Sequence, residues 1–174
     1  RIALNKQFFN YNLFSLLGLN DSRILTFIGG GGKTSLMNTL GKEFANQGIP
    51  TLLTTTTHIM KPDFLPEKSC IEEEKFEQLV EIFSNFQEQP GEVPLAALGI
   101  PEKLINGNVK WRSPSMDFCE RTAEFSTKCS IKTTYKSLKI LCEGDGSKRL
   151  PIKLPKEGEP VFFPKTDTVI GVVG

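Results

Sequence analysis

A run of four glycines between an apolar stretch and a helix-like stretch constrains this chain more than any other feature. In ILTFIGGGGKTSLMNTL (residues 24–40), a lysine and two hydroxyl residues follow the glycines at once. The residues concerned are Gly29, Gly30, Gly31, Gly32, Lys33, Thr34 and Ser35. A strand that turns directly into a helix presents backbone N–H groups and the positive end of the helix dipole to an anion. The segment therefore predicts a phosphate-binding loop.

The spacing of this loop is two residues tighter than the common G-x-x-x-x-G-K-[ST] pattern. Counting back from Gly32, the first glycine of that pattern should fall at position 27, which is Phe27. Residues 29–34 instead fit G-x-x-G-K-T, which is similar to the G-T-N-G-K-T loop of the amide ligases that build the bacterial cell-wall peptide. A shorter loop can still wrap a phosphate when its residues carry no side chains. The alternative is a glycine-rich turn before an ordinary helix.

Two further segments are expected beside this loop, because ligands of parallel sheets gather at the carboxyl ends of the strands. TTTTHI (residues 54–59) ends one strand, and Thr56, Thr57 and His58 are candidates for binding nucleotide or positioning a water. Its threonines are also good strand formers, so a purely structural role is the alternative.

CEGDGSKR (residues 142–149) ends another strand and supplies the acids that such a site needs. Glu143 and Asp145 are candidate catalytic carboxylates, and Asp145 with the Thr34 hydroxyl is the expected Mg²⁺ site. Lys33 is expected to stabilise the charge of the transferring phosphate. Lys148 and Arg149 are candidates for neutralising further phosphate charge, with surface ion pairs as the alternative.

The alternation of strand-like and helix-like segments predicts the fold class. Strand-like runs lie at 24–28, 49–55, 93–100, 138–142 and 169–173, and helix-like runs at 33–47, 71–86 and 113–125. This order predicts an α/β fold, a mostly parallel sheet flanked by helices in three layers. With 174 residues we expect one nucleotide-binding domain over residues 1–174, including a variable or inserted region at 61–136. The strand-like end VIGVVG is expected to be buried and to lead into a further C-terminal segment.

Composition narrows the partners. The net charge of +1 favours neither nucleic acid nor an anionic membrane, and no apolar run approaches the roughly 18 residues of a membrane span. The four cysteines, Cys70, Cys119, Cys129 and Cys142, form no C-x-x-C pair. They are expected to be buried reduced thiols of a cytoplasmic protein.

Taken together, the motifs resemble those of one family. GGGGKT, TTTTHI, E-x-DGS-K/R-x-LP-x-K, EPV and VIGVVG occur in this order in the YqeC family of bacterial proteins, described as accessory proteins of selenium-dependent molybdenum hydroxylases. The resemblance implies a P-loop NTPase-like fold and a role in maturation of such a hydroxylase. The expected partner is then the molybdenum hydroxylase itself or its maturation machinery. Many relatives have alanine where this chain has Gly144.

Three functions remain open from the sequence. The first is Mg²⁺-dependent binding and slow hydrolysis of ATP or GTP by a maturation factor. The second is a kinase or ligase that passes phosphate to a small substrate, and the third is a module that binds nucleotide or another phosphate without turnover. A homodimer is an expected assembly under each of them.

Overall fold

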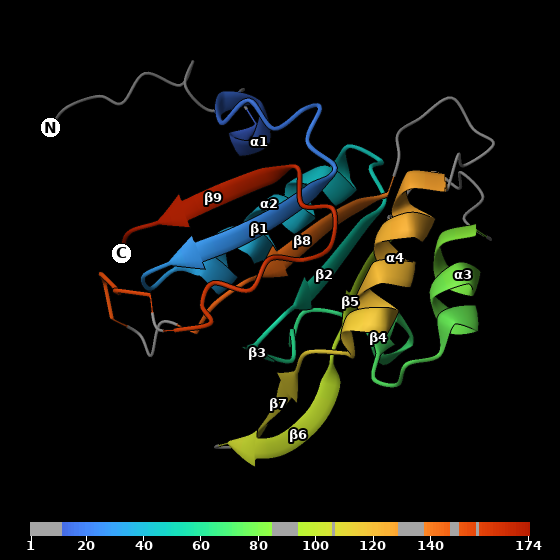
Figure 1. The fold of residues 1–174 in the computed structure, drawn as a ribbon. Helices are drawn as coiled ribbons and strands as arrows, with labels where there is room; N and C mark the ends of the chain where they lie inside the picture. The colour runs from blue at the N-terminus through green and yellow to red at the C-terminus, as the bar shows by residue number, and fades with distance from the viewer. Residues whose placement is uncertain (1–11, 85–93, 106, 129–137, 147–149, 156) are drawn as a thin grey trace, which may run out of the picture.

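The central element of the structure, a computed structural model, is a six-stranded sheet (Figure 1). The structure describes residues 12–84, 94–105, 107–128, 138–146, 150–155 and 157–174. The strand order is β4-β5-β2-β8-β1-β9, and every neighbouring pair is parallel. These strands are β1 (Ile24–Gly29), β2 (Thr51–Thr55), β4 (Cys70–Ile71), β5 (Leu95–Leu98), β8 (Lys139–Glu143) and β9 (Thr168–Val172).

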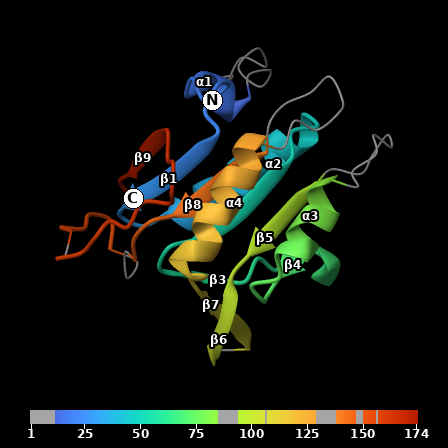
Figure 2. The same ribbon diagram turned by 45° about the vertical axis from the view of Figure 1, so that its right-hand side comes forward.

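Helices cover both faces of this sheet, as Figures 1 and 2 show. The helices are α1 (Leu13–Leu16), α2 (Lys33–Asn46), α3 (Phe76–Ser84) and α4 (Met116–Lys128), with a 3₁₀ helix at Glu67–Ser69. Leu25 and Phe27 of β1 pack toward Met37 of α2 in one core cluster. Ile140 of β8 packs toward Phe118 of α4 in the other. This arrangement confirms the predicted α/β fold with a mostly parallel sheet flanked by helices and agrees with a P-loop NTPase-like three-layer fold.

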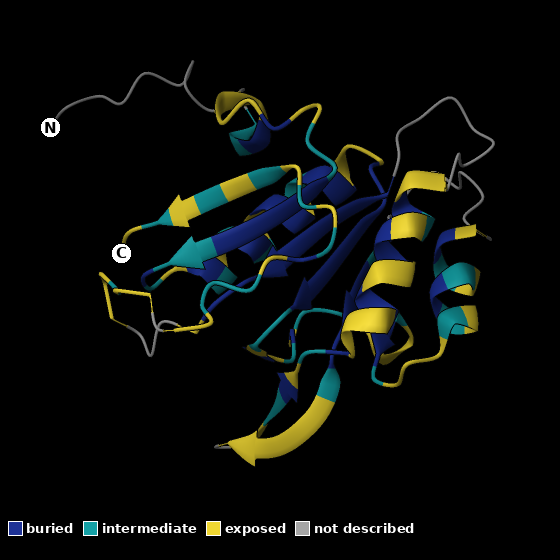
Figure 3. Ribbon diagram, viewed as in Figure 1, coloured by how far each residue is buried: buried dark blue, intermediate teal, exposed yellow. Residues whose placement is uncertain are grey.

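A second, three-stranded antiparallel sheet extends from the carboxyl end of β2. It consists of β3 (His58–Met60), β7 (Asn108–Arg112) and β6 (Ile100–Ile105) in that order. Trp111 anchors it, because the indole is fully buried and its Nε1–H donates to Glu72 Oε1 at 3.1 Å. In contrast, β6 is exposed along most of its length (Figure 3).

Two expectations from the sequence were wrong. The helix expected over 71–86 begins only at Phe76, because Cys70 and Ile71 form the short edge strand β4 beside β5. The last strand, expected to be buried, is the opposite edge of the sheet, and Val169 is 48% exposed. Among the described residues, no helix is long and apolar enough to cross a membrane.

Candidate functional site

The glycine loop, residues 29–35, runs from the end of β1 into the first turn of α2. Gly32 adopts a left-handed backbone with φ 93°, a conformation that side chains disfavour, and α2 begins at the next residue, Lys33. The strand–loop–helix arrangement predicted from the sequence is therefore confirmed. Its two halves, however, face very different surroundings.

The first half, residues 29–31, is closed off by oxygen atoms of the chain itself. The Gly30 N–H donates to the Val172 carbonyl and the Gly31 N–H to the Leu150 carbonyl, each at 2.7 Å. The Gly29 N–H donates to the Asp145 carboxylate, at 3.0 Å from Oδ2 and 3.2 Å from Oδ1. These N–H groups are already satisfied by the protein.

The first two glycines are also required by packing. A Cβ on Gly29 would lie 2.5 Å from the Val172 carbonyl oxygen, and one on Gly30 would lie 2.0 Å from that of Pro151. Backbone atoms cannot give way as a flexible side chain would. The run of glycines in this half therefore follows from close contact with the end of β9 and with residues 150–151.

The second half, residues 32–35, is open. The first hydrogen bond of α2 runs from the Leu36 N–H to the Gly32 carbonyl at 2.9 Å. Within the described part of the chain, the N–H groups of Lys33, Thr34 and Ser35 meet no acceptor. Such N–H groups at a helix start need an external partner, and the helix dipole favours a negative one.

Lys33 lies folded back over the loop. Its side chain is 1% exposed, and its Nζ donates to the carbonyls of Gly29 at 2.8 Å and Gly30 at 3.0 Å. It forms an ion pair with Asp145 Oδ1 at 2.9 Å and lies 3.9 Å from Glu143 Oε1. The oxygens around this buried ammonium group are contacts that the oxygens of a bound phosphate could replace.

Glu143 ends β8 between β1 and β2, in register with Phe27 and Thr55. Its Oε2 accepts a hydrogen bond from the Thr34 hydroxyl at 2.6 Å. Burial raises the pKa of Glu143, the Thr34 hydrogen bond and the Lys33 charge oppose this, and the charge of Asp145 adds to it. The carboxylate beside Thr34 is thus that of Glu143, whereas the sequence suggested Asp145.

The three candidates from TTTTHI, Thr56, Thr57 and His58, follow the end of β2 and contact different parts of the chain. The Thr56 hydroxyl donates to the Val161 carbonyl at 2.5 Å, and the Thr56 N–H donates to the Glu143 carbonyl at 3.1 Å. Thr57 bends away, its N–H donating to the Thr55 hydroxyl at 3.0 Å. His58 enters β3, exposed, with its Nε2 3.4 Å from Glu102 Oε2. Of the three, Thr56 is the one that contacts the backbone of a candidate acid.

Lys148 and Arg149 lie outside the described residues, so their predicted roles stay predictions. A different cation, Lys153, lies at the site with its Nζ 3.8 Å from Asp145 Oδ2. The sequence signal was its place in LP-x-K after the acids, but nothing in that pattern indicates which way the side chain turns. Cys142 is fully buried, and burial raises the pKa of its thiol, so it is an unreactive core residue.

The fold and the site define a class: a parallel α/β protein whose first strand runs through a glycine loop into a helix, with a buried lysine and two acids at the turn. The model of the YqeC family, described as YqeC protein, matches residues 25–174, and the chain belongs to this family. It is 29% identical over 160 residues to the "Uncharacterized protein YqeC" of Escherichia coli (strain K12). That match covers 87% of this chain and 51% of the relative, so the chain spans about half the relative's length. No solved structure matches the chain.

Proposed function

We propose that this site binds the phosphates of ATP or GTP together with Mg²⁺ and hydrolyses the nucleotide slowly. The observation that carries the proposal is the pairing of a buried lysine with three N–H groups at the start of α2 that have no partner among the described residues. Lys33 is held by Asp145, an oxygen ligand that a phosphate could replace. A structural turn would need neither the buried charge nor the open helix end.

The donor set fits Mg²⁺. The Thr34 hydroxyl and the Glu143 carboxylate are 2.6 Å apart, which gives two hard oxygen ligands from different elements. Among the described residues no group of three or more His, Cys, Asp or Glu side chains could hold a metal. That is the pattern expected when Mg²⁺ is shared with substrate phosphates. When bound, Mg²⁺ neutralises phosphate charge.

The roles of the chain's own groups follow from their positions. The N–H groups of residues 33–35 would bind phosphate oxygens, and Lys33 would neutralise the charge of the phosphates bound there. Glu143 would serve as the metal carboxylate. Asp145, released from Lys33, would be the group left to orient a water.

Membership of the YqeC family supports an accessory role, and we propose that its client is a selenium-dependent molybdenum hydroxylase. Nucleotide-driven rearrangement is a common device of such factors, and Thr56 links the backbone of Glu143 to the start of the second sheet. The test is the activity of such a hydroxylase in cells whose copy of this protein carries Lys33→Met. Full hydroxylase activity there would contradict the accessory role.

The biochemical test is calorimetric titration of the protein with ATP and GTP, with and without Mg²⁺. We expect micromolar binding that requires Mg²⁺ and weakens roughly a hundredfold in Lys33→Met. Lys75→Met, which removes the same charge from a side chain 64% exposed, is the matched control and should bind like the unmodified protein. No binding of either nucleotide would contradict the proposal.

Turnover measured on the same samples separates the open alternatives. Slow hydrolysis without an acceptor supports the proposal. Rapid turnover only with a small-molecule acceptor would instead indicate a kinase or ligase. Binding with no turnover under any condition would indicate a non-catalytic module.

A further inference from the structure

One lysine in the segment after the acids points the opposite way from its neighbours. In residues 150–154, the side chains of Leu150, Ile152 and Leu154 are 53%, 71% and 86% exposed. The Lys153 side chain is only 8% exposed. This reverses the usual preference of apolar and charged residues, and a lysine is buried in this way only where anions hold it.

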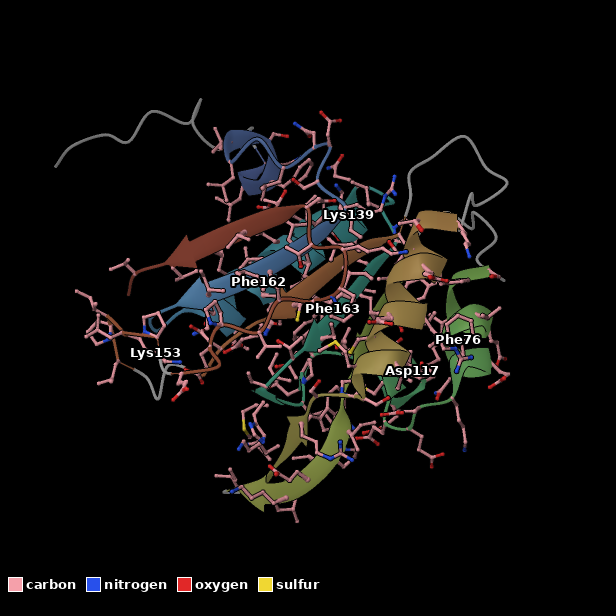
Figure 4. All side chains as sticks on the ribbon, in the orientation of Figure 1. Phe76, Asp117, Lys139, Lys153, Phe162 and Phe163 are labelled. Atoms are coloured by element: carbon pink, nitrogen blue, oxygen red, sulfur yellow. The ribbon has the colours of Figure 1, made fainter. Side chains whose placement is uncertain are left out.

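The anions that hold Lys153 belong to the candidate site. Lys153 Nζ forms a close ion pair with the Glu159 carboxylate and lies 3.8 Å from Asp145 Oδ2. The other oxygen of Asp145 is 2.9 Å from Lys33 Nζ. One carboxylate therefore lies between two buried ammonium groups. Figure 4 shows Lys153 at the carboxyl edge of the sheet, beyond the end of β1.

The two lysines approach Asp145 from different sides. Lys33 comes from the first turn of α2. Lys153 comes from the segment whose Leu150 carbonyl accepts from the Gly31 N–H and whose Pro151 carbonyl lies against Gly30. A phosphate that displaced the Asp145 carboxylate would consequently meet a cation on each side.

We propose that Lys153 is a second phosphate-binding cation, which contacts the terminal phosphate of a bound nucleoside triphosphate and lets the site distinguish triphosphate from diphosphate. The inference rests on the proposed function, because it assigns Lys153 to the same site. Lys33 is held over the loop by the Gly29 and Gly30 carbonyls, beside the start of α2. Lys153 contacts the other oxygen of Asp145 and is the cation that we assign to the outermost phosphate.

The burial of Lys153 also has a structural explanation, in which the Lys153–Glu159 ion pair only holds residues 157–160 against the site. The two explanations differ in what Glu159 does. If the pair is only structural, Lys153→Gln and Glu159→Gln both lose stability and neither changes the ratio of triphosphate to diphosphate affinity. If Lys153 binds phosphate, Glu159 competes with the ligand for it, and Glu159→Gln leaves the cation free to bind.

The experiment compares the imido analogues of ATP and GTP with ADP and GDP, by calorimetry in excess Mg²⁺. In Lys153→Gln we expect the Kd of the triphosphate analogue to rise roughly tenfold and that of the diphosphate to change less than twofold. In Glu159→Gln we expect the triphosphate analogue to bind about threefold more tightly, with the diphosphate unchanged.

A triphosphate-to-diphosphate affinity ratio that stays at the value of the unmodified protein in both variants would overturn the proposal, whatever the change in melting temperature. If Lys153→Gln does not fold, the ratio in Glu159→Gln decides, and an unchanged ratio there also overturns it. Nucleotide binding by the unmodified protein distinguishes this failure from a failure of the proposed function. If the unmodified protein binds nucleotide but neither variant changes the ratio, only the role of Lys153 is rejected. If the unmodified protein binds no nucleotide, the proposed function and the role of Lys153 are both rejected.

Discussion

The two halves of the glycine loop, residues 29–31 and 32–35, are adjacent in the sequence but face different surroundings. Residues 29–31 direct their N–H groups to Asp145, Val172 and Leu150, oxygens of the chain itself. Residues 33–35, just past Gly32, direct theirs to no described acceptor. Close packing thus explains Gly29 and Gly30 of the first half, and the open N–H groups of the second half are those that we propose to bind phosphate. The proposal also accounts for the contracted spacing of the loop, because a phosphate would contact only the second half.

The largest effect should come from adding a methyl group to the packed half. Gly30→Ala would place a Cβ 2.0 Å from the Pro151 carbonyl oxygen, so residues 150–151 must leave or the loop must shift. We expect a loss of about 3 kcal/mol in the free energy of unfolding, measured by urea denaturation. The control is Gly146→Ala, where a Cβ would meet nothing within 4 Å. Equal stability of the two variants would mean that residues 150–151 do not cover the loop.

The sequence predicts those parts of the fold and the site in which apolar residues recur at the spacing of a strand or a helix. The apolar run into glycines and the helical spacing after Lys33 predicted β1, the loop and α2, because packing against a sheet imposes those periods. The acids at the end of β8 followed from the same reasoning. The sequence therefore predicts that Glu143 and Asp145 lie near Lys33, and the distances from Lys33 Nζ to the two carboxylates agree with this prediction.

Other features have no such signal. The two-residue strand β4 is too short to show alternation, and its residues looked like the start of α3. β8 ends at Glu143, so alternation does not extend to Asp145, and the choice of Glu143 as the partner of Thr34 is set by the turn. Likewise, the inward direction of Lys153 is set by its anionic partners in irregular chain.

The second prediction contrasts the acids that serve the two halves. Asp145 holds the Gly29 N–H and Lys33, so Asp145→Asn leaves a buried cation without its nearest charge. We expect it to lower the free energy of unfolding by about 2 kcal/mol. Glu143→Gln can keep the Thr34 hydrogen bond and removes a buried carboxylate, so it should spare stability and weaken Mg²⁺-dependent nucleotide binding roughly tenfold.

Denaturation curves and titrations with and without Mg²⁺ on both variants give the answer. If Asp145→Asn were the variant that lost its Mg²⁺ dependence while Glu143→Gln kept it, Asp145 would be the metal carboxylate, as the sequence predicts.

The third prediction uses pH to separate the open half from the packed one. Burial raises the pKa of Glu143 above its usual value, because the carboxyl group at the end of β8 is shielded from solvent. Its contribution to stability is fully present below the ordinary pKa and is lost as pH rises through the raised one. Binding of Mg²⁺ needs the carboxylate, so Mg²⁺-dependent affinity should rise with pH over that interval, by up to about tenfold per unit.

The control for this pH dependence is Glu143→Gln, titrated over the same range. Protonation of the nucleotide is common to both proteins, so only the difference between their profiles belongs to Glu143. Parallel profiles would show that the Glu143 carboxylate takes no part in binding the metal.

The smallest effects should come from neighbouring candidates that the structure separates. Thr56→Val removes a hydroxyl that donates to the Val161 carbonyl at 2.5 Å, beside the backbone of Glu143. It should cost about 1 kcal/mol in the free energy of unfolding. His58→Ala alters an exposed residue of β3 whose partner is Glu102, and nucleotide Kd should change less than twofold. A larger loss of nucleotide affinity in His58→Ala than in Thr56→Val would show that the second sheet turns toward the open half of the loop when nucleotide binds.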